Sequence, residues 1–103
     1  MAGRTKISIS KGATVVAVKE QVSCMVGEEA VILHLKDGTY FGLNPVGATV
    51  WKLMEKPKTV AQLRDAVVHE FEVGRTECER DLLNLLQSLA KAGLVEVRDG
   101  KVA

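Results

Sequence analysis

The dipeptide formed by Asn44 and Pro45 divides the chain into two parts with different hydrophobic patterns. Before it, short apolar runs rich in β-branched residues are typical of strands. After it, apolar residues recur with the spacing of core-facing helices. Asn is a favoured N-cap, and Pro suits the first helical position because its missing N–H needs no partner there. The sequence therefore predicts an α+β fold in which a three-stranded antiparallel sheet precedes three helices.

Three segments of the first part read as strands, namely residues 14–26, 29–36 and 39–43. The dipeptide of Asp37 and Gly38 is a strong turn signal, because Gly accepts positive φ without steric cost. It predicts a hairpin between the last two segments. A second turn over residues 27–29 extends this hairpin to a three-stranded meander.

The first two helices have clear start signals. The first begins after the Asn44 cap and ends before Pro57. The second begins at Thr59, and Gln62 three residues later completes a capping box; Gly74 ends it. The expected core-facing positions of the two helices are Val46, Val50, Leu53 and Met54, then Val60, Leu63, Val67 and Phe71.

The third helix is expected to start at Thr76, where Glu79 would complete a second capping box. Gly93 supplies the left-handed position at its end. The alternating sequence that follows, which contains a second Asp-Gly pair at residues 99–100, predicts a short terminal strand or small hairpin.

Composition limits the functional class. The chain has 103 residues, of which 47% are hydrophobic and 26% charged, with a net charge of +1. This is the composition of one ordinary globular domain, without the excess charge that draws a protein to nucleic acid or anionic lipid. No signal peptide or apolar segment of about 18 residues is visible, so we expect a cytoplasmic protein. We expect a flexible arm over residues 1–13, a folded domain over residues 14–98 and a tail over residues 99–103.

Residues able to carry out catalysis are few and scattered. Cys24 and Cys78 have no C-x-x-C spacing, and with His34 and His69 they form no metal-ligand pattern. Cys78 lies in the first turn of the third helix, where the dipole can lower a thiol pKa. A buried, unreactive thiol is the simpler interpretation, and we expect no catalytic, cofactor-binding or metal-binding residues.

The third helix carries more apolar surface than one buried face needs. Five leucines fall within eight positions, and four of them form one stripe: Leu82, Leu85, Leu86 and Leu89, with Leu83 on its flank. Either the helix is central and buried on two sides, or one flank lines an apolar groove for a ligand or peptide.

The strand over residues 39–43 raises a related question. As the last strand of a meander it lies at an edge, yet it lacks the Pro, Lys or other charge that commonly protects an edge from pairing. Either another element covers this edge, or an extended peptide adds to it as a further strand. Gly42 fits the second interpretation, because a missing side chain allows another backbone to approach. Phe41 and Leu43 are expected to face the core, and Tyr40 to lie nearer the peptide.

A DNA-binding role is the main alternative class. Two helices joined by a turn and followed by a terminal strand are consistent with a winged helix-turn-helix. The third helix would then be the recognition helix, but its first turns carry Glu77, Glu79 and Asp81. Acidic groups there oppose binding to phosphates.

The segments YFGLNPVGATVW (residues 40–51) and DLLNLLQSLAKAGL (residues 81–94), in this order and spacing, resemble the PqqD family, the peptide chaperones also grouped as RiPP recognition elements. The resemblance runs from about Val15 to Val97. It implies three strands followed by three helices of winged helix-turn-helix type and a non-enzymatic role. Such proteins bind the leader of a ribosomally made precursor peptide, which adds to the third strand and packs on the third helix.

The resemblance also implies the site and the partners. The residues it marks for peptide binding are Thr39, Tyr40, Phe41, Gly42 and Leu43 on the strand, and Asp81, Leu82, Asn84 and Leu85 on the helix. The sequence is more similar to the stand-alone leader-binding proteins of lasso peptide clusters, which work with a separate leader peptidase. The alternative is the chaperone of pyrroloquinoline quinone synthesis, which works with a radical S-adenosylmethionine enzyme. We expect no nucleic acid or membrane partner, and a monomer or a dimer.

Overall fold

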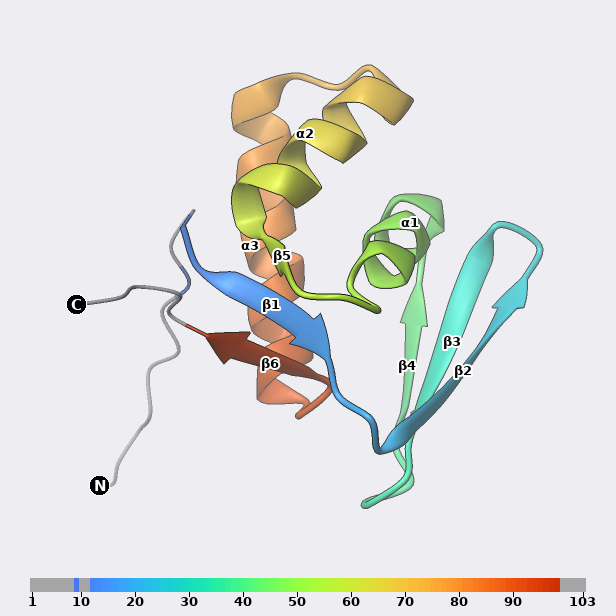
Figure 1. The fold of residues 1–103 in the computed structure, drawn as a ribbon. Helices are drawn as coiled ribbons and strands as arrows, with labels where there is room; N and C mark the ends of the chain where they lie inside the picture. The colour runs from blue at the N-terminus through green and yellow to red at the C-terminus, as the bar shows by residue number, and fades with distance from the viewer. Residues whose placement is uncertain (1–8, 10–11, 99–103) are drawn as a thin grey trace.

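The computed structural model describes Ile9 and residues 12–98 (Figure 1). Within these residues, three helices and six strands follow one another along the chain. They are β1 (Thr14–Ala17), β2 (Gln21–Val26), β3 (Glu29–His34), β4 (Tyr40–Leu43), α1 (Pro45–Leu53), β5 (Lys58–Thr59), α2 (Val60–Phe71), α3 (Arg75–Lys91) and β6 (Val95–Arg98). The predicted α+β class, with three antiparallel strands followed by three helices, is confirmed.

The meander consists of β2, β3 and β4 in that order, all antiparallel. The turn between β2 and β3 contains Gly27, whose φ of 67° is the left-handed conformation that the turn requires. The second turn is longer than a two-residue hairpin loop and spans residues 35–39. Gly38 adopts a φ of 74° in it, and the Asp37 carboxylate accepts hydrogen bonds from the Thr39 N–H and hydroxyl at 3.1 and 2.8 Å.

A second small sheet, in the order β5-β1-β6, corrects the expectation of one continuous strand over residues 14–26. That segment is interrupted over residues 18–20, and its two halves, β1 and β2, belong to different sheets. The terminal strand pairs antiparallel with β1, with Val15 opposite Val97. Such pairing joins segments about eighty residues apart, which a local pattern cannot reveal. The second Asp-Gly pair, at residues 99–100, lies outside the described residues.

The first two helices start as predicted. Asn44 Oδ1 accepts the Gly47 N–H at 2.9 Å, with Pro45 in the first helical position. Thr59 and Gln62 form the capping box, with bonds of 2.9 and 3.1 Å. The end of α2 differs from the expectation, because the helix ends at Phe71 and Glu72, rather than Gly74, takes the left-handed conformation with φ 53°.

The predicted capping box of the third helix is wrong. Its N-cap is Gly74, which offers no side-chain bond, and α3 already begins at Arg75. The Glu79 carboxylate accepts a bond from Arg64 Nη1 on α2 at 2.8 Å instead. This tertiary ion pair, between two largely buried side chains, fixes α2 against α3. At the other end Gly93 has the expected left-handed conformation, with φ 77°.

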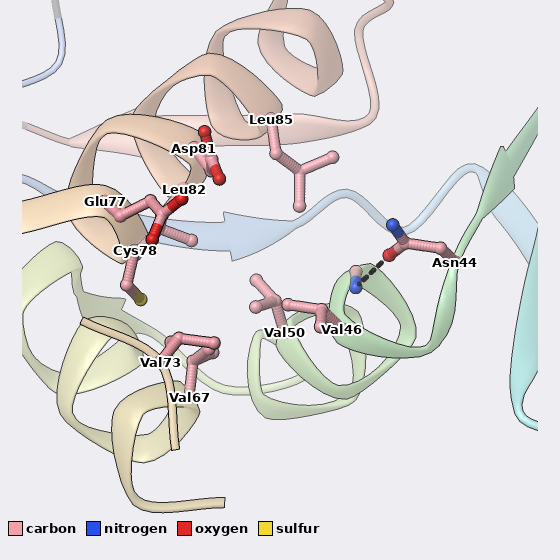
Figure 2. A pocket seen from close by; sticks show the side chains of 11 residues that line it. Asn44, Val46, Val50, Val67, Val73, Glu77, Cys78, Asp81, Leu82 and Leu85 are labelled. Atoms are coloured by element: carbon pink, nitrogen blue, oxygen red, sulfur yellow. Dashed lines mark hydrogen bonds between the residues drawn. The ribbon is translucent and has the colours of Figure 1, made fainter. Parts of the chain in front are cut away.

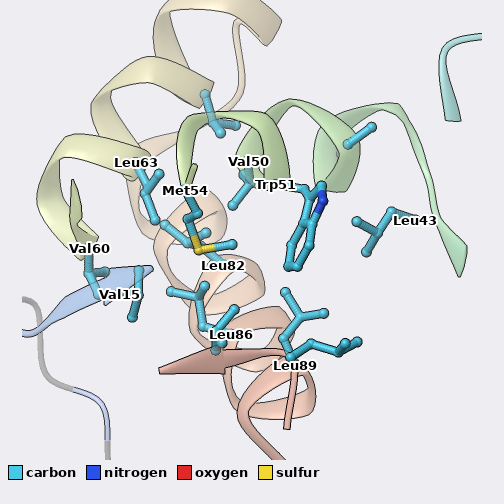
Figure 3. Close-up of a cluster of buried hydrophobic side chains, with 14 of the residues drawn as sticks. Val15, Leu43, Val50, Trp51, Met54, Val60, Leu63, Leu82, Leu86 and Leu89 are labelled. Atoms are coloured by element: carbon cyan, nitrogen blue, oxygen red, sulfur yellow. The ribbon is translucent and has the colours of Figure 1, made fainter. Parts of the chain in front are cut away.

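The core lies between the helices and the inner faces of both sheets (Figure 3). Its largest fully buried side chains are Val15, Ile32, Val50, Met54, Val60, Leu63, Leu86, Leu89 and Leu94. In α1 the predicted stripe is confirmed, with Val46 and Leu53 half-buried against the core, but it missed Ala48 and Trp51, which are also buried. Trp51 Nε1 donates a hydrogen bond to Ser23 Oγ on β2 at 3.2 Å.

The two ends of the chain are described only in part. Ile9 and Ala13 are buried, and the Ala13 carbonyl accepts the Val60 N–H at 3.1 Å, so these two residues pack on the domain. The rest of the expected arm, residues 1–8 and 10–11, and the expected tail, residues 99–103, lie outside the described residues. None of the three helices in the described part of the chain is long and apolar enough to cross a bilayer.

Candidate functional site

β4 is an edge strand of the meander. Among the described strands it pairs with β3 alone, so its other side carries unpaired backbone groups. The alternation of its side chains follows the prediction. Leu43 is buried and Phe41 packs against the core, whereas Tyr40 is 72% exposed and Gly42 is exposed.

The hydrogen-bonding direction of β4 follows from its hairpin. The His34 N–H donates to the Thr39 carbonyl at 2.9 Å, so His34 is a hydrogen-bonded position that faces β4. Such positions alternate along an antiparallel ladder, and the next bonded residue on β4 is Phe41. The N–H and C=O groups of Tyr40 and Gly42 therefore point away from β3, toward the open edge.

An apolar pocket of about 320 Å³ lies where β4 passes into α1 (Figure 2). Side chains from all three helices and from the α2–α3 connection form its apolar lining. These are Val46, Val50, Val67, Val73, Leu82 and Leu85. Binding pockets of proteins hold roughly 300–1,000 Å³, so this one suits one or two side chains rather than a large cofactor.

Leu43, at the end of β4, touches the wall of the pocket. Gly47 lines the pocket, and a Cβ on Gly47 would lie 3.2 Å from Cδ2 and 3.3 Å from Cβ of Leu43. Asn44 also lines the pocket while its Oδ1 caps α1. The end of the edge strand is therefore packed against the wall of the pocket.

One face of α3 forms the opposite wall. Glu77, Asp81 and Leu85 are spaced four residues apart, which places them in one row along the helix. In Figure 2 the Asp81 carboxylate lies above Leu82 and Cys78, and the Glu77 carboxylate lies beside Leu82. Both carboxylates are exposed, whereas Leu82 and Cys78 are buried. The wall is therefore acidic toward the start of α3 and apolar at Leu85.

Cys78 is a buried part of the pocket floor. Burial raises the pKa of its thiol above the ordinary value, and the nearby Asp81 carboxylate raises it further. Its Sγ lies 3.9 Å from the Arg64 carbonyl oxygen. The prediction that Cys78 is buried is confirmed, and its low reactivity stays a prediction, because a thiol held in the neutral form is a poor nucleophile.

The other candidate residues lie away from the pocket. Cys24 is an exposed free cysteine on β2, and His69 is exposed on α2. His34 is buried, with its Nδ1 accepting the Lys36 N–H at 3.2 Å. It packs against the turn after α3, where a Cβ on Gly93 would lie 3.1 Å from its Nε2.

The structure brings together only some of the residues marked from the sequence. Asp81, Leu82 and Leu85 line the pocket. Asn84 is exposed on α3 outside the lining. Of the five marked residues 39–43, Thr39 ends the turn before β4 and the other four form β4, and none of the five lines the pocket. Glu77 was not marked for binding, although its spacing from Asp81 was a usable signal. The valines of α1 and α2 had been assigned wholly to the core.

The sequence and the fold match a known family. A sequence model of the family described as Coenzyme PQQ synthesis protein D (PqqD) matches residues 29–95. The chain therefore belongs to the PqqD family, which confirms the resemblance drawn from its motifs. The chain matches none of the curated proteins with which it was compared.

Two solved structures are similar to this one. The first, TbiB1 in complex with the TbiA(beta) leader peptide, is 39% identical with a TM-score of 0.73, over 85% of this chain and 99% of that chain. The second, a lasso peptide synthetase B1 complexed with the leader peptide, is 26% identical with a TM-score of 0.69, over 80% of this chain and 96% of that one.

Proposed function

We propose that this protein binds the leader segment of a ribosomally made precursor peptide and presents it to a separate modifying enzyme, without catalysing a reaction itself. The observation that carries the proposal is the open edge of β4 beside an apolar pocket. Support comes from the 39% identical structure, which was solved with a leader peptide bound. In our proposal the leader adds as a strand to β4 and places an apolar side chain in the pocket.

Strand addition would use the outward groups of β4. The N–H and C=O of Tyr40 and Gly42 are available to a peptide backbone, and such bonds do not depend on the peptide's sequence. Nothing among the described residues lies within 4 Å of a Cβ built on Gly42, so the outer face of the sheet is uncovered at this position. Residues 39–43 are thus proposed as the pairing surface.

Selectivity would come from the pocket. Leu82 and Leu85 offer an apolar wall on α3, and Val46 and Val50 offer the facing wall on α1. An apolar or aromatic side chain of the leader loses contact with water on entering, which is the main source of affinity at such anchor positions. Asp81 and Asn84 are proposed as polar contacts at the edge of this surface.

The role of the complex would be to raise the local concentration of the substrate. An enzyme that recognises the bound leader acts on a tethered precursor peptide rather than a freely diffusing one. We favour a leader peptidase of a lasso peptide cluster as that enzyme, because both similar structures are leader complexes and one is named as a lasso peptide synthetase. A Kd between nanomolar and micromolar, about 8–12 kcal/mol, would serve this role.

A second candidate is the chaperone of pyrroloquinoline quinone synthesis, working with a radical S-adenosylmethionine enzyme. The observation in its favour is the matching family model. The two candidates differ in which precursor binds, so parallel titrations with a lasso leader and with the quinone precursor peptide separate them. Winged-helix DNA binding gains no support from α3, whose face toward the pocket carries Glu77 and Asp81.

Fluorescence polarisation tests the proposal. Labelled TbiA(beta) leader, and the leader of a precursor encoded beside this gene, are titrated with the protein. We expect saturable binding of at least one, abolished by Leu85→Asp, which puts a charge in the apolar wall. Leu35→Asp is the matched control, because Leu35 is 54% exposed in the loop before β4 and outside the pocket. If neither leader binds saturably, the proposal is rejected.

A further inference from the structure

The charged side chains that line the pocket are all acidic. Apart from the Asn44 amide, the polar side chains in its lining are the carboxylates of Glu77 and Asp81. Both stand on the wall above the apolar floor (Figure 2). We infer that the peptide segment taken by this pocket carries a Lys or Arg side chain beside its apolar anchor, an inference that rests on the proposed function.

Both carboxylates remain available to an incoming cation. The nearest base to Asp81 is Arg80, whose Nε lies 3.8 Å from Oδ1, and both side chains are about two-thirds or more exposed, at 67% and 71%. An ion pair this long and this exposed contributes little to stability. A basic side chain of the peptide can therefore readily replace Arg80 beside Asp81. Arg64, the other nearby guanidinium, is held by Glu79 and Asp65 at 2.8 and 2.9 Å.

The spacing of the wall fixes the spacing of the peptide residues. Each step of four residues along α3, from Glu77 to Asp81 and from Asp81 to Leu85, rises about 6 Å. Alternate side chains on one face of an extended peptide are about 6.6 Å apart. A strand lying along this wall therefore presents its apolar residue to Leu85 and its basic residue, two positions away, to Asp81.

The sign of the charge at the rim selects between peptides. Leu82 and Val50 form the apolar base of the pocket, whereas the carboxylates of Glu77 and Asp81 lie at its exposed rim. A basic side chain of the peptide is attracted by both carboxylates, whereas an acidic side chain is repelled by both. Pairs of this exposed kind change Kd by roughly two- to fivefold each.

Glu77 also has a structural explanation that the test must separate. It lies in the first turn of α3, where an acidic group interacts favourably with the helix dipole. That role predicts a loss of stability when Glu77 is neutralised, but no change in which peptides bind. Asp81 lies beyond the first turn, so the dipole gives less reason for its charge.

The experiment is a selection of phage-displayed random dodecapeptides on three immobilised proteins. These are the wild type, the double variant Glu77→Gln with Asp81→Asn, and a control variant, Glu55→Gln with Glu72→Gln, whose exposed carboxylates lie outside the pocket. Thermal melting of each protein before selection confirms that it is folded.

We expect wild type and control to enrich peptides with Lys or Arg two positions from an apolar residue. The pocket variant should keep the apolar preference and lose the basic one. For one enriched synthetic peptide, replacing the basic residue by Gln should weaken binding to wild type by roughly fivefold and to the pocket variant hardly at all.

Equal enrichment of basic residues on wild type and pocket variant, or enrichment of apolar peptides without basic residues, would overturn this inference and leave the proposed function standing. Failure of the wild type to enrich any peptide would also overturn this inference. The proposed function would fall separately, if neither leader bound saturably in the polarisation titration, and this inference would then fall with it.

Discussion

Leu43 at the end of β4 packs directly on Gly47 in the first turn of α1, and the contact is so close that a Cβ on Gly47 would lie 3.2 Å from Leu43 Cδ2. Gly47 lines the pocket, and Leu43 belongs to the proposed pairing strand. This contact therefore joins the two parts of the candidate site, and it sets their relative position.

Gly47→Ala should disturb both parts. The new methyl group meets Cδ2 and Cβ of Leu43 and, at 3.4 Å, Asn44 Oδ1. Since a Leu Cβ cannot rotate away, we expect a net loss of about 1 kcal/mol in unfolding free energy despite the better helix propensity of Ala. Leader affinity should fall as well. Urea unfolding and polarisation titration measure the two effects.

Gly42→Ala is the matched control for that substitution. A Cβ at Gly42 meets no atom within 4 Å, and its φ is not in the left-handed region. Stability should be unchanged or slightly higher, because Ala restricts the unfolded chain more than Gly does. Equal losses of stability from the two substitutions would contradict the close packing of Leu43 on Gly47.

Ser23→Ala should destabilise the protein by about 1 kcal/mol, because it removes the hydrogen-bond partner of the Trp51 indole. The Trp51 ring is buried, but its indole N–H faces the exposed Ser23, so water replaces only part of the lost bond. Ser88→Ala, on the exposed side of α3, should leave stability unchanged or raise it slightly, since Ala favours helix. Thermal unfolding measures the stability of both variants. Equal losses of stability would be inconsistent with the hydrogen bond from Trp51 to Ser23.

The two cysteines should differ in reactivity. Cys24 is exposed, whereas Cys78 is buried with its pKa raised by burial and by Asp81. A raised pKa lowers the thiolate fraction at any given pH, and the thiolate is the reactive form. With iodoacetamide at mildly alkaline pH, mass spectrometry should find Cys24 modified well before Cys78. Comparable rates in the folded protein would show that the pocket floor is open to solvent.

The loop between β3 and β4 should weaken in acid. Hydrogen bonds from Thr39 hold the pKa of Asp37 below its ordinary value of 3.8. A lowered folded pKa contributes stability that is fully present above the unfolded value and is lost as pH falls through the folded one. Asp37→Ala should therefore lower Tm at neutral pH, and the difference from wild type should shrink below about pH 4. A difference independent of pH would contradict this role of the carboxylate.

Local signals in the sequence predicted most of the fold. Asn44 with Pro45 and Thr59 with Gln62 mark helix starts through bonds that span only three residues, so they can be read without tertiary information. Thr76 does not cap α3, which begins at Arg75 after Gly74, and the Glu79 carboxylate pairs with Arg64 of another helix. The pairing of β1 with β6 was missed because it depends on distant segments.

The candidate site was predictable on the strand and only partly on the helices. The alternation of β4, with Tyr40 exposed and Leu43 buried, follows directly from the pattern. The pocket does not, because Val46 and Val50 show the same spacing whether they fill a core or line a cavity. Only the arrangement of α1 against α3 distinguishes these cases.

Amide hydrogen exchange of β4 tests the central claim most directly. In the free protein the outward N–H groups of Tyr40 and Gly42 should exchange fast, and those of Phe41 and Leu43, which face β3, slowly. Saturation with a binding leader peptide should slow exchange at Tyr40 and Gly42 and leave Phe41 and Leu43 nearly unchanged. Saturable binding that leaves the amides of Tyr40 and Gly42 as fast as before would contradict strand addition at this edge.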